Sequence, residues 1–196
     1  MFKKDSSEYV PYFVALAIIL AMSSLFMPFF LLPLLQDGLF HSPDYWFFAS
    51  PTSGYFITGG LFLYAGAVAG VMAYVQYNVE GKKVQKTIGV LAALLPVLIV
   101  GYLTVHQYYY FNNQGIYTSD FLSVEETAHP WESVSEAVYH MYNDNGTMRV
   151  KSLELAYEDG SSLSFEYNHD ISSNRVAIQR ILQHYGVELE RIRKTE

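Results

Sequence analysis

Residues 55–79, YFITGGLFLYAGAVAGVMAYVQYNV, form an apolar stretch without a single Asp, Glu, Lys or Arg. Two more stretches of the same kind lie on either side of it, at Val10–Leu35 and Thr87–Phe111. Each is long enough for an α-helix that crosses a bilayer, which takes roughly 20 apolar residues. The sequence therefore predicts a transmembrane domain, residues 1–111, with three helices at about 10–35, 55–79 and 87–111.

The basic residues between these stretches are distributed unevenly. Lysines precede the first stretch and the third (Lys3, Lys4, Lys82, Lys83 and Lys86), whereas the loop before the second stretch has no Lys or Arg. After Phe111 the next basic residue is Arg149. Because cytoplasmic loops retain Lys and Arg, this pattern predicts a multi-pass protein of the cell membrane with a cytoplasmic N-terminus. The first loop and the C-terminal domain, residues 112–196, are then extracytoplasmic.

The first stretch could also be read as a cleaved signal peptide, because lysines precede it. Its apolar run is longer than the core of such a peptide, and no A-x-A site closes it. We therefore interpret it as a retained membrane anchor.

The net charge of −7 belongs to the C-terminal domain. Residues 112–196 contain 14 acidic and 7 basic side chains. Such a domain repels nucleic acid and anionic lipid headgroups, so neither is expected as its partner. The chain has no cysteine, which excludes disulfides and thiolate metal sites.

Small residues recur on one face of the second predicted helix: Gly59, Gly66, Gly70 and Ala73. The spacing Gly66-x-x-x-Gly70 allows two helix backbones to approach closely. We expect this face to pack against another helix of the same chain; homo-oligomerisation through Gly66 and Gly70 is the alternative.

Prolines and one histidine interrupt the other two apolar stretches. Pro28 and Pro33 predict a kink or an early end in the first. In the third, His106 and Gln107 lie near the outer end, next to three tyrosines (Tyr108, Tyr109 and Tyr110) that are typical of an interfacial belt. An ionisable group in a span can indicate function, but the spans offer no charged partner for a proton relay. We interpret His106 as interfacial.

The first outer loop concentrates aromatic residues together with His41 and Asp44. Trp46 and its neighbours fit a short segment lying on the membrane surface. A His–Asp pair could bind a metal or act in catalysis, but without a third partner we assign no catalytic, metal or cofactor residues.

In the C-terminal domain, Pro130 opens a segment with apolar residues at helical spacing (Trp131, Val134, Val138 and Met141), which predicts a short helix. A strand from Ala137 onward is the alternative. On a helix, Glu132, Glu136 and His140 would share one face. That face could bind a divalent metal, although a solvated polar face is the simpler interpretation.

Two alternating segments, Met148–Tyr157 and Ser161–Tyr167, predict an antiparallel hairpin joined at Asp159-Gly160. A helix capped by Ser172 or Ser173 and ended by Gly186 follows, with an apolar stripe at Ile178, Ile181, Leu182 and Tyr185. The last strand is expected at Val187–Ile192. The fold class is thus a three-helix membrane protein followed by a small α+β domain with an antiparallel sheet and a C-terminal helix.

The order of elements carries a resemblance that covers roughly Ile116–Ile192. Phe121, then Trp131-x-x-Val134, a hairpin at Asp159-Gly160, and a helix ended by Gly186 before a strand resemble the small domains of uncharacterised Gram-positive multi-pass membrane proteins. Those domains are similar in layout to pleckstrin-homology-like modules. The resemblance implies a bacterial source and supplies no catalytic residues.

Two functions fit these observations. The first is a non-enzymatic membrane protein whose acidic outer domain binds or regulates a partner in the membrane or at the cell surface, through a sheet edge or exposed tyrosines. The second is a small membrane-embedded enzyme or transporter that acts on a lipid or envelope precursor. Its polar groups would be His41, Asp44, His106 and Gln107. We prefer the first.

Overall fold

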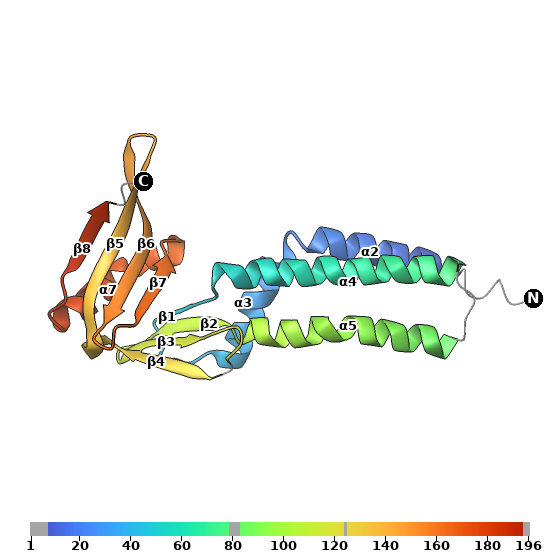
Figure 1. Ribbon diagram of the computed structural model, residues 1–196, viewed down its shortest axis with the longest axis horizontal. Coiled ribbons are helices and arrows are strands. Elements are labelled where there is room, and N and C mark those ends of the chain that lie inside the picture. The colour runs from blue at the N-terminus through green and yellow to red at the C-terminus, as the bar shows by residue number, and fades with distance from the viewer. Residues whose placement is uncertain (1–7, 79–82, 124, 194–196) are drawn as a thin grey trace, which may run out of the picture. The chain divides into compact units, whose positions relative to one another are not determined.

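The computed structural model describes residues 8–78, 83–123 and 125–193, and the chain divides into two compact units (Figure 1). The helical unit comprises Met1–His41, Ser50–Tyr108 and Ser119–Glu125, and the sheet unit comprises Ser42–Ala49, Tyr109–Thr118 and Glu126–Glu196. Lys3, Lys4 and Lys82, on which the predicted orientation depends, lie outside the described residues. The sheet unit is therefore assembled from separate parts of the chain, including part of the first predicted loop.

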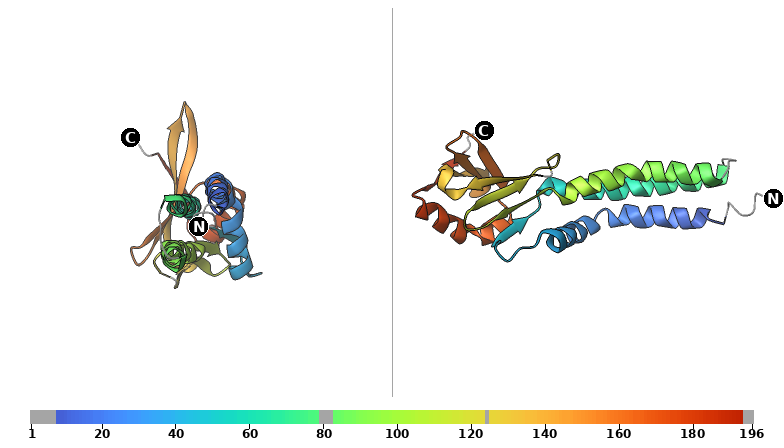
Figure 2. Two further views of the ribbon diagram at one scale, coloured as in Figure 1. Left: turned by 90° about the vertical axis from the view of Figure 1, so that its right-hand side faces the viewer. Right: turned by 90° about the horizontal axis from the view of Figure 1, so that it is seen from below.

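Two helices of the helical unit are long and apolar enough to cross a membrane, α4 (Thr52–Asn78) and α5 (Lys83–Val105). A third passes the same test only as a bent pair, α2 (Val10–Ser23) and α3 (Met27–Phe40), whose axes differ by 78°. In the end-on view of Figure 2, α2, α4 and α5 run alongside one another.

The break between α2 and α3 has a local cause in the sequence. Pro28 lies in the first turn of α3, where its missing N–H costs no hydrogen bond, and the Ser24 hydroxyl donates to the Ala21 carbonyl at 2.7 Å. The kink or early end expected near Pro28 is confirmed, and the stretch 10–35 forms two helices rather than one continuous helix. The second of them continues past Pro33 to Phe40.

The third predicted helix is shorter than expected, because α5 ends at Val105. Residues Tyr108–Phe111 form strand β2 and are all buried, so the interpretation of the three tyrosines as an interfacial belt was wrong. A run of aromatic residues favours a strand when a partner strand is available.

The small residues of α4 differ in what they face. A Cβ added to Gly59 would lie 3.1 Å from the backbone oxygen of Ser24, and one added to Gly66 would lie 3.1 Å from that of Ala17 in α2. A Cβ added to Gly70 would meet nothing within 4 Å. Ala73 is buried. The close approach of backbones at Gly59 and Gly66 is thus made within the chain.

The first sheet has the strand order β1-β2-β3-β4. Its strands are β1 (Phe47–Ala49), β2 (Tyr108–Phe111), β3 (Gly115–Ser119) and β4 (Glu126–Pro130). β1 runs antiparallel to β2, with Phe47 opposite Phe111. The aromatic part of the first loop is therefore a strand of the sheet unit, and the expected segment on the membrane surface was wrong.

The second sheet has the order β7-β6-β5-β8, with β5 (Val134–Asp144), β6 (Thr147–Tyr157), β7 (Ser162–Glu166) and β8 (Leu189–Arg193). β5, β6 and β7 are antiparallel neighbours, as predicted for the hairpin at Asp159-Gly160. β8 runs parallel to β5, so the sheet is mixed rather than antiparallel. The connection through two helices carries the chain back to the edge where β7 began, so β8 runs in the same direction as β7 and parallel to β5.

The helix predicted from Trp131 to Met141 was wrong. Only a short 3-10 turn, η1 (Trp131–Ser133), precedes β5, so the strand alternative applies and begins earlier than Ala137. The β-favouring residues Val134, Val138 and Tyr139 find a long antiparallel partner in β6, and this pairing outweighs the helical spacing.

The chain between β7 and β8 forms α6 (His169–Ser173) and α7 (Arg175–His184). Asn168 caps α6 by accepting from the Ile171 N–H at 3.0 Å. Ser172 and Ser173 lie inside α6, and α7 begins after Asn174 without a side-chain cap, so the predicted cap at Ser172 or Ser173 was wrong. Gly186 ends the helical segment at φ +77°, the left-handed conformation expected for it.

One hydrophobic core serves both sheets of the sheet unit. It joins Phe47 and Phe111 of the first sheet to Tyr139 and Leu153 of the second, and α7 adds Ile178 and Leu182. Trp131 is fully buried, its ring 5.7 Å from that of Phe111 and perpendicular to it, and its Nε1 donates to the Asn112 carbonyl at 2.8 Å. Residues of the first loop are therefore part of the core.

Replacing Phe47 by alanine should destabilise the sheet unit by about 3–5 kcal/mol, because a buried ring is lost and a cavity remains. Phe56→Ala is the matched control, since Phe56 is 77% exposed on α4. Hydrogen exchange of β5 and β6 in the full chain would measure the change. Equal protection in the two variants would contradict the assignment of the first loop to this core.

Gly66→Leu should destabilise the packing of α4 on α2 by roughly 1–3 kcal/mol, because its Cβ would lie only 3.1 Å from the Ala17 carbonyl oxygen and the rest of the side chain would overpack the contact between the helices. Gly70→Leu is the control, with open space at its Cβ position. Thermal unfolding of the full chain in detergent should show a lower midpoint for the first variant alone.

Candidate functional site

The two histidines proposed for the outer interface each interact with their own helix. His41 Nδ1 lies 3.1 Å from Asp37 Oδ1, and both side chains are at least 70% exposed. His106 Nδ1 lies 2.9 Å from the Tyr102 carbonyl oxygen, with the rings of Tyr102 and Phe40 alongside. These contacts orient two imidazoles, and no hydrogen bond or ring contact in the described part of the helical unit joins one to the other.

Gln107 belongs instead to a polar cluster centred on Gln36. The Gln36 side chain is fully buried and its Nε2 donates to the carbonyl oxygens of Val105 and Gln107, at 3.1 and 3.0 Å. Its Oε1 accepts from the Ser50 hydroxyl. The Gln107 side chain in turn accepts from Ser53, at 3.4 Å. The sequence analysis missed Gln36, although a lone glutamine at the end of an apolar stretch was the available signal.

The Gln36 cluster satisfies backbone carbonyls that the end of α5 leaves without helical partners. In an apolar environment such carbonyls need a protein donor, because no water is at hand. The cluster therefore has a structural role, tying α3 to the end of α5 within the helical unit.

Asp44 and Trp46 lie in the sheet unit, and only Trp46 is engaged in packing. Its ring stacks on Trp131 with centroids 6.5 Å apart, and its backbone N–H donates to the Phe111 carbonyl at 3.2 Å. The Asp44 N–H approaches the Ser42 hydroxyl at 3.4 Å. Trp46 is thus a structural residue of the domain, which the membrane-surface interpretation missed.

Glu132, Glu136 and His140 do not share a helix face. Glu132 is in η1 and the other two are on β5, where residues four apart are separated by about 13 Å. His140 Nε2 lies 2.6 Å from Glu154 Oε2 across the sheet. In residues 8–78, 83–123 and 125–193, no three His, Asp or Glu side chains are grouped so that they could hold a metal ion.

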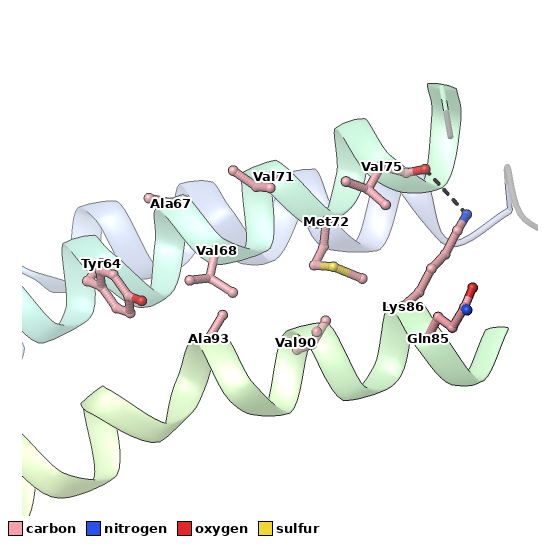
Figure 3. A pocket seen from close by; sticks show the side chains of 11 residues that line it. Tyr64, Ala67, Val68, Val71, Met72, Val75, Gln85, Lys86, Val90 and Ala93 are labelled. Atoms are coloured by element: carbon pink, nitrogen blue, oxygen red, sulfur yellow. Dashed lines mark hydrogen bonds between the residues drawn. The ribbon is translucent and has the colours of Figure 1, made fainter. Parts of the chain in front are cut away.

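An apolar groove of about 560 Å³ runs between α4 and α5 in the helical unit (Figure 3). Its walls are mostly apolar side chains, among them Val68, Met72 and Val90. At one end, Lys86 Nζ donates to the Val75 carbonyl oxygen and the Gln76 side chain, both at 3.3 Å. In a bilayer, such a groove has the chemistry to take an acyl chain, with a cation at one end.

A second groove, of about 400 Å³, lies between α7 and β8 in the sheet unit. α7 contributes Arg175, Gln179 and Gln183, which are spaced by four and lie on one helical face. Leu189 and Arg191 of β8 form the opposite wall, one strand period apart. Unlike the groove between α4 and α5, this one is lined by polar and cationic groups.

The β5–β6 hairpin extends beyond its flanking strands (Figure 1). Pairing with β8 reaches Met141, and pairing with β7 reaches Ser152. The residues beyond these positions form a two-stranded ribbon that turns at Asn145-Gly146, both with positive φ. Its large apolar side chains, Tyr142 and Met148, are 40% and 42% exposed.

Burial raises the pKa of three tyrosines of the sheet unit above the usual value: Tyr110, Tyr139 and Tyr157. Tyr110 donates to Glu126 at 3.1 Å, and this carboxylate raises the Tyr110 pKa further. The buried hydroxyls of Tyr139 and Tyr157 have no hydrogen-bond partner among the described residues. These phenols stay neutral at physiological pH and act through packing or as hydrogen-bonding groups.

No protein-family model, curated protein or solved structure matches this chain. The resemblance to pleckstrin-homology-like modules therefore stays a prediction. The sheet unit has two distinctive surface features, the projecting β5–β6 ribbon and the groove lined by Arg175 and Arg191.

Gln36→Leu should destabilise the helical unit by about 1–3 kcal/mol, because two carbonyl oxygens lose their donor in an apolar environment. Gln85→Leu is the control, since Gln85 is exposed on α5. Thermal unfolding in detergent would measure both variants. A Gln36→Leu variant as stable as the control would show that the cluster contributes nothing.

Proposed function

We propose that the chain is a non-enzymatic, multi-pass protein of the cell membrane that presents an acidic extracytoplasmic domain to a partner protein. Two apolar helices and a bent pair support the membrane location. The lysines that precede the first and third apolar stretches support a cytoplasmic N-terminus. On this proposal the sheet unit is the part that binds, and the partner is another membrane or surface protein.

The observation that carries the proposal is the projecting β5–β6 ribbon. An isolated two-stranded hairpin is marginally stable in water, so a long one gains from a partner that covers it. Methionine and tyrosine are enriched at protein interfaces, and here Met148 and Tyr142 lie exposed beyond the last pairs with β7 and β8.

The two faces of the ribbon have different chemistry. Asn143 pairs with Met148, and Met141 with Val150, so Met148 continues the face on which Met141 and Val150 pack partly against the core. On the other face, Tyr142 pairs with Arg149, and Arg149 Nε lies 3.1 Å from Asp144 Oδ2. The ion pair braces the ribbon, and the apolar face extends past the sheet. A partner that covers this face would bury Met148.

A photoreactive amino acid placed at Met148 in the full chain should cross-link to a single partner in the membranes of the source cells. The control position is Val176, which is 67% exposed on α7. The same amino acid placed at Tyr142, on the opposite face of the ribbon, should cross-link much less than at Met148. A yield at position 148 no higher than at position 176 or position 142 would contradict the proposal.

A further inference from the structure

Arg191 faces the same side of the sheet as core residues, although it is charged. On β8 it lies beside Tyr139 of β5, and the side chains of neighbouring residues in paired strands point to the same face. Tyr139 is only 1% exposed and belongs to the core under α7. Arg191 is accommodated because β8 is the edge strand and the groove beside α7 lies open there.

Arg175 approaches the same place from the helix. Its Cζ lies 6.0 Å from the centre of the Tyr139 ring, and the side chain lines the groove together with Arg191. Among the described residues, neither guanidinium has a carboxylate within salt-bridge distance. This is unusual in a domain with twice as many acidic as basic residues. The buried Tyr139 hydroxyl has no hydrogen-bond partner in the part of the chain that the structure describes.

Two unpaired arginines at one groove fit an anion, because a guanidinium binds a carboxylate or phosphate through two parallel hydrogen bonds. The negative charge around the groove limits which kind of anion can bind there. Glu188 lines the same groove, and the net charge of the domain repels polyanions. A single carboxylate is attracted by the arginines without bringing further negative charge into an acidic surrounding.

The remaining walls of the groove match a peptide. Gln179 and Gln183 offer amide donors and acceptors, Val187 and Leu189 offer apolar surface, and β8 is the last strand of its sheet. An open strand edge accepts an extended chain by backbone pairing, and a nearby cationic pocket can hold its terminal carboxylate.

We propose that the groove between α7 and β8 binds the C-terminal carboxylate of an extended segment of a partner protein, with Arg175 and Arg191 on the carboxylate. This inference rests on the proposed function and names the chemistry that the partner must present. The groove is a different surface from the β5–β6 ribbon, so binding at the groove and binding at the ribbon can be tested separately.

The test uses the full chain in lipid nanodiscs and a library of fluorescein-labelled hexapeptides with free C-termini, read by fluorescence polarisation. The tightest binders should weaken at least tenfold when the same peptides are amidated at the C-terminus. A second set of peptides, amidated at the C-terminus but carrying an internal Asp or Glu, tests whether a side-chain carboxylate can replace the terminal one. If those bind as tightly as the free acids, the terminal carboxylate is not the ligand and the proposal is wrong.

Arg175→Gln and Arg191→Gln should each weaken the free-acid peptides at least tenfold. Arg180→Gln is the matched control, because Arg180 is exposed on α7 but does not line the groove. Glu188→Gln should strengthen binding. Arg191→Lys keeps the charge and loses the two-pronged geometry, so it should retain the fold and still weaken binding. The proposal fails if Arg175→Gln and Arg191→Gln behave like Arg180→Gln, or if polyphosphate displaces the peptides.

The ribbon experiment separates this proposal from the wider one. If Met148 cross-links a partner while no free-acid peptide binds the nanodiscs, the groove proposal is overturned and the partner-binding function stands. If free-acid peptides bind through Arg175 and Arg191 while position 148 cross-links nothing, the groove proposal is supported and the ribbon is not the contact.

Discussion

The backbone pairing of β1 with β2 is the interaction on which the sheet unit depends. It brings Phe47–Ala49, from between two helices of the chain, against residues Tyr109–Phe111. Phe47, Phe111 and Trp131 then share one core with the second sheet. The chain therefore has to complete a contact between distant segments before this core can close, and such non-local pairing slows folding.

This pairing changes what can be regarded as the folded domain. A fragment that begins at Asn112 lacks Phe47, Ala49, Tyr109 and Phe111, all of which belong to the core cluster. Each buried ring of this kind contributes several kcal/mol, and small domains have little stability to spare. Experiments on the acidic domain are therefore best done with the full chain. The helical unit likewise depends on a contact between distant segments, because Gln36 of α3 donates to carbonyl oxygens at the end of α5.

Local signals in the sequence predicted local structure well. The hairpin at Asp159-Gly160 and the end of the last helix at Gly186 follow from glycine in positions with positive φ. The helix predicted from Trp131 failed because periodicity over a few residues cannot show that a long partner strand exists. The same reason explains why Tyr108–Phe111 were misread as an interfacial belt: the sequence does not show that β1 pairs with these residues to form a sheet. The groove of Arg175 and Arg191 could not be found, because it depends on β8 lying parallel to β5.

The sequence of β8, Leu189-Glu-Arg-Ile-Arg193, combines two properties that a selective edge needs. Charged residues on an edge strand deter pairing between identical copies, which would place like charges opposite one another in a parallel arrangement. The same charges do not exclude a chain of complementary character. Because Arg191 faces the groove and its neighbours Glu190 and Ile192 face the opposite side, the two faces of the edge present different chemistry. A partner strand must therefore match both faces at once, and a carboxylate on the α7 side is the match for Arg175 and Arg191.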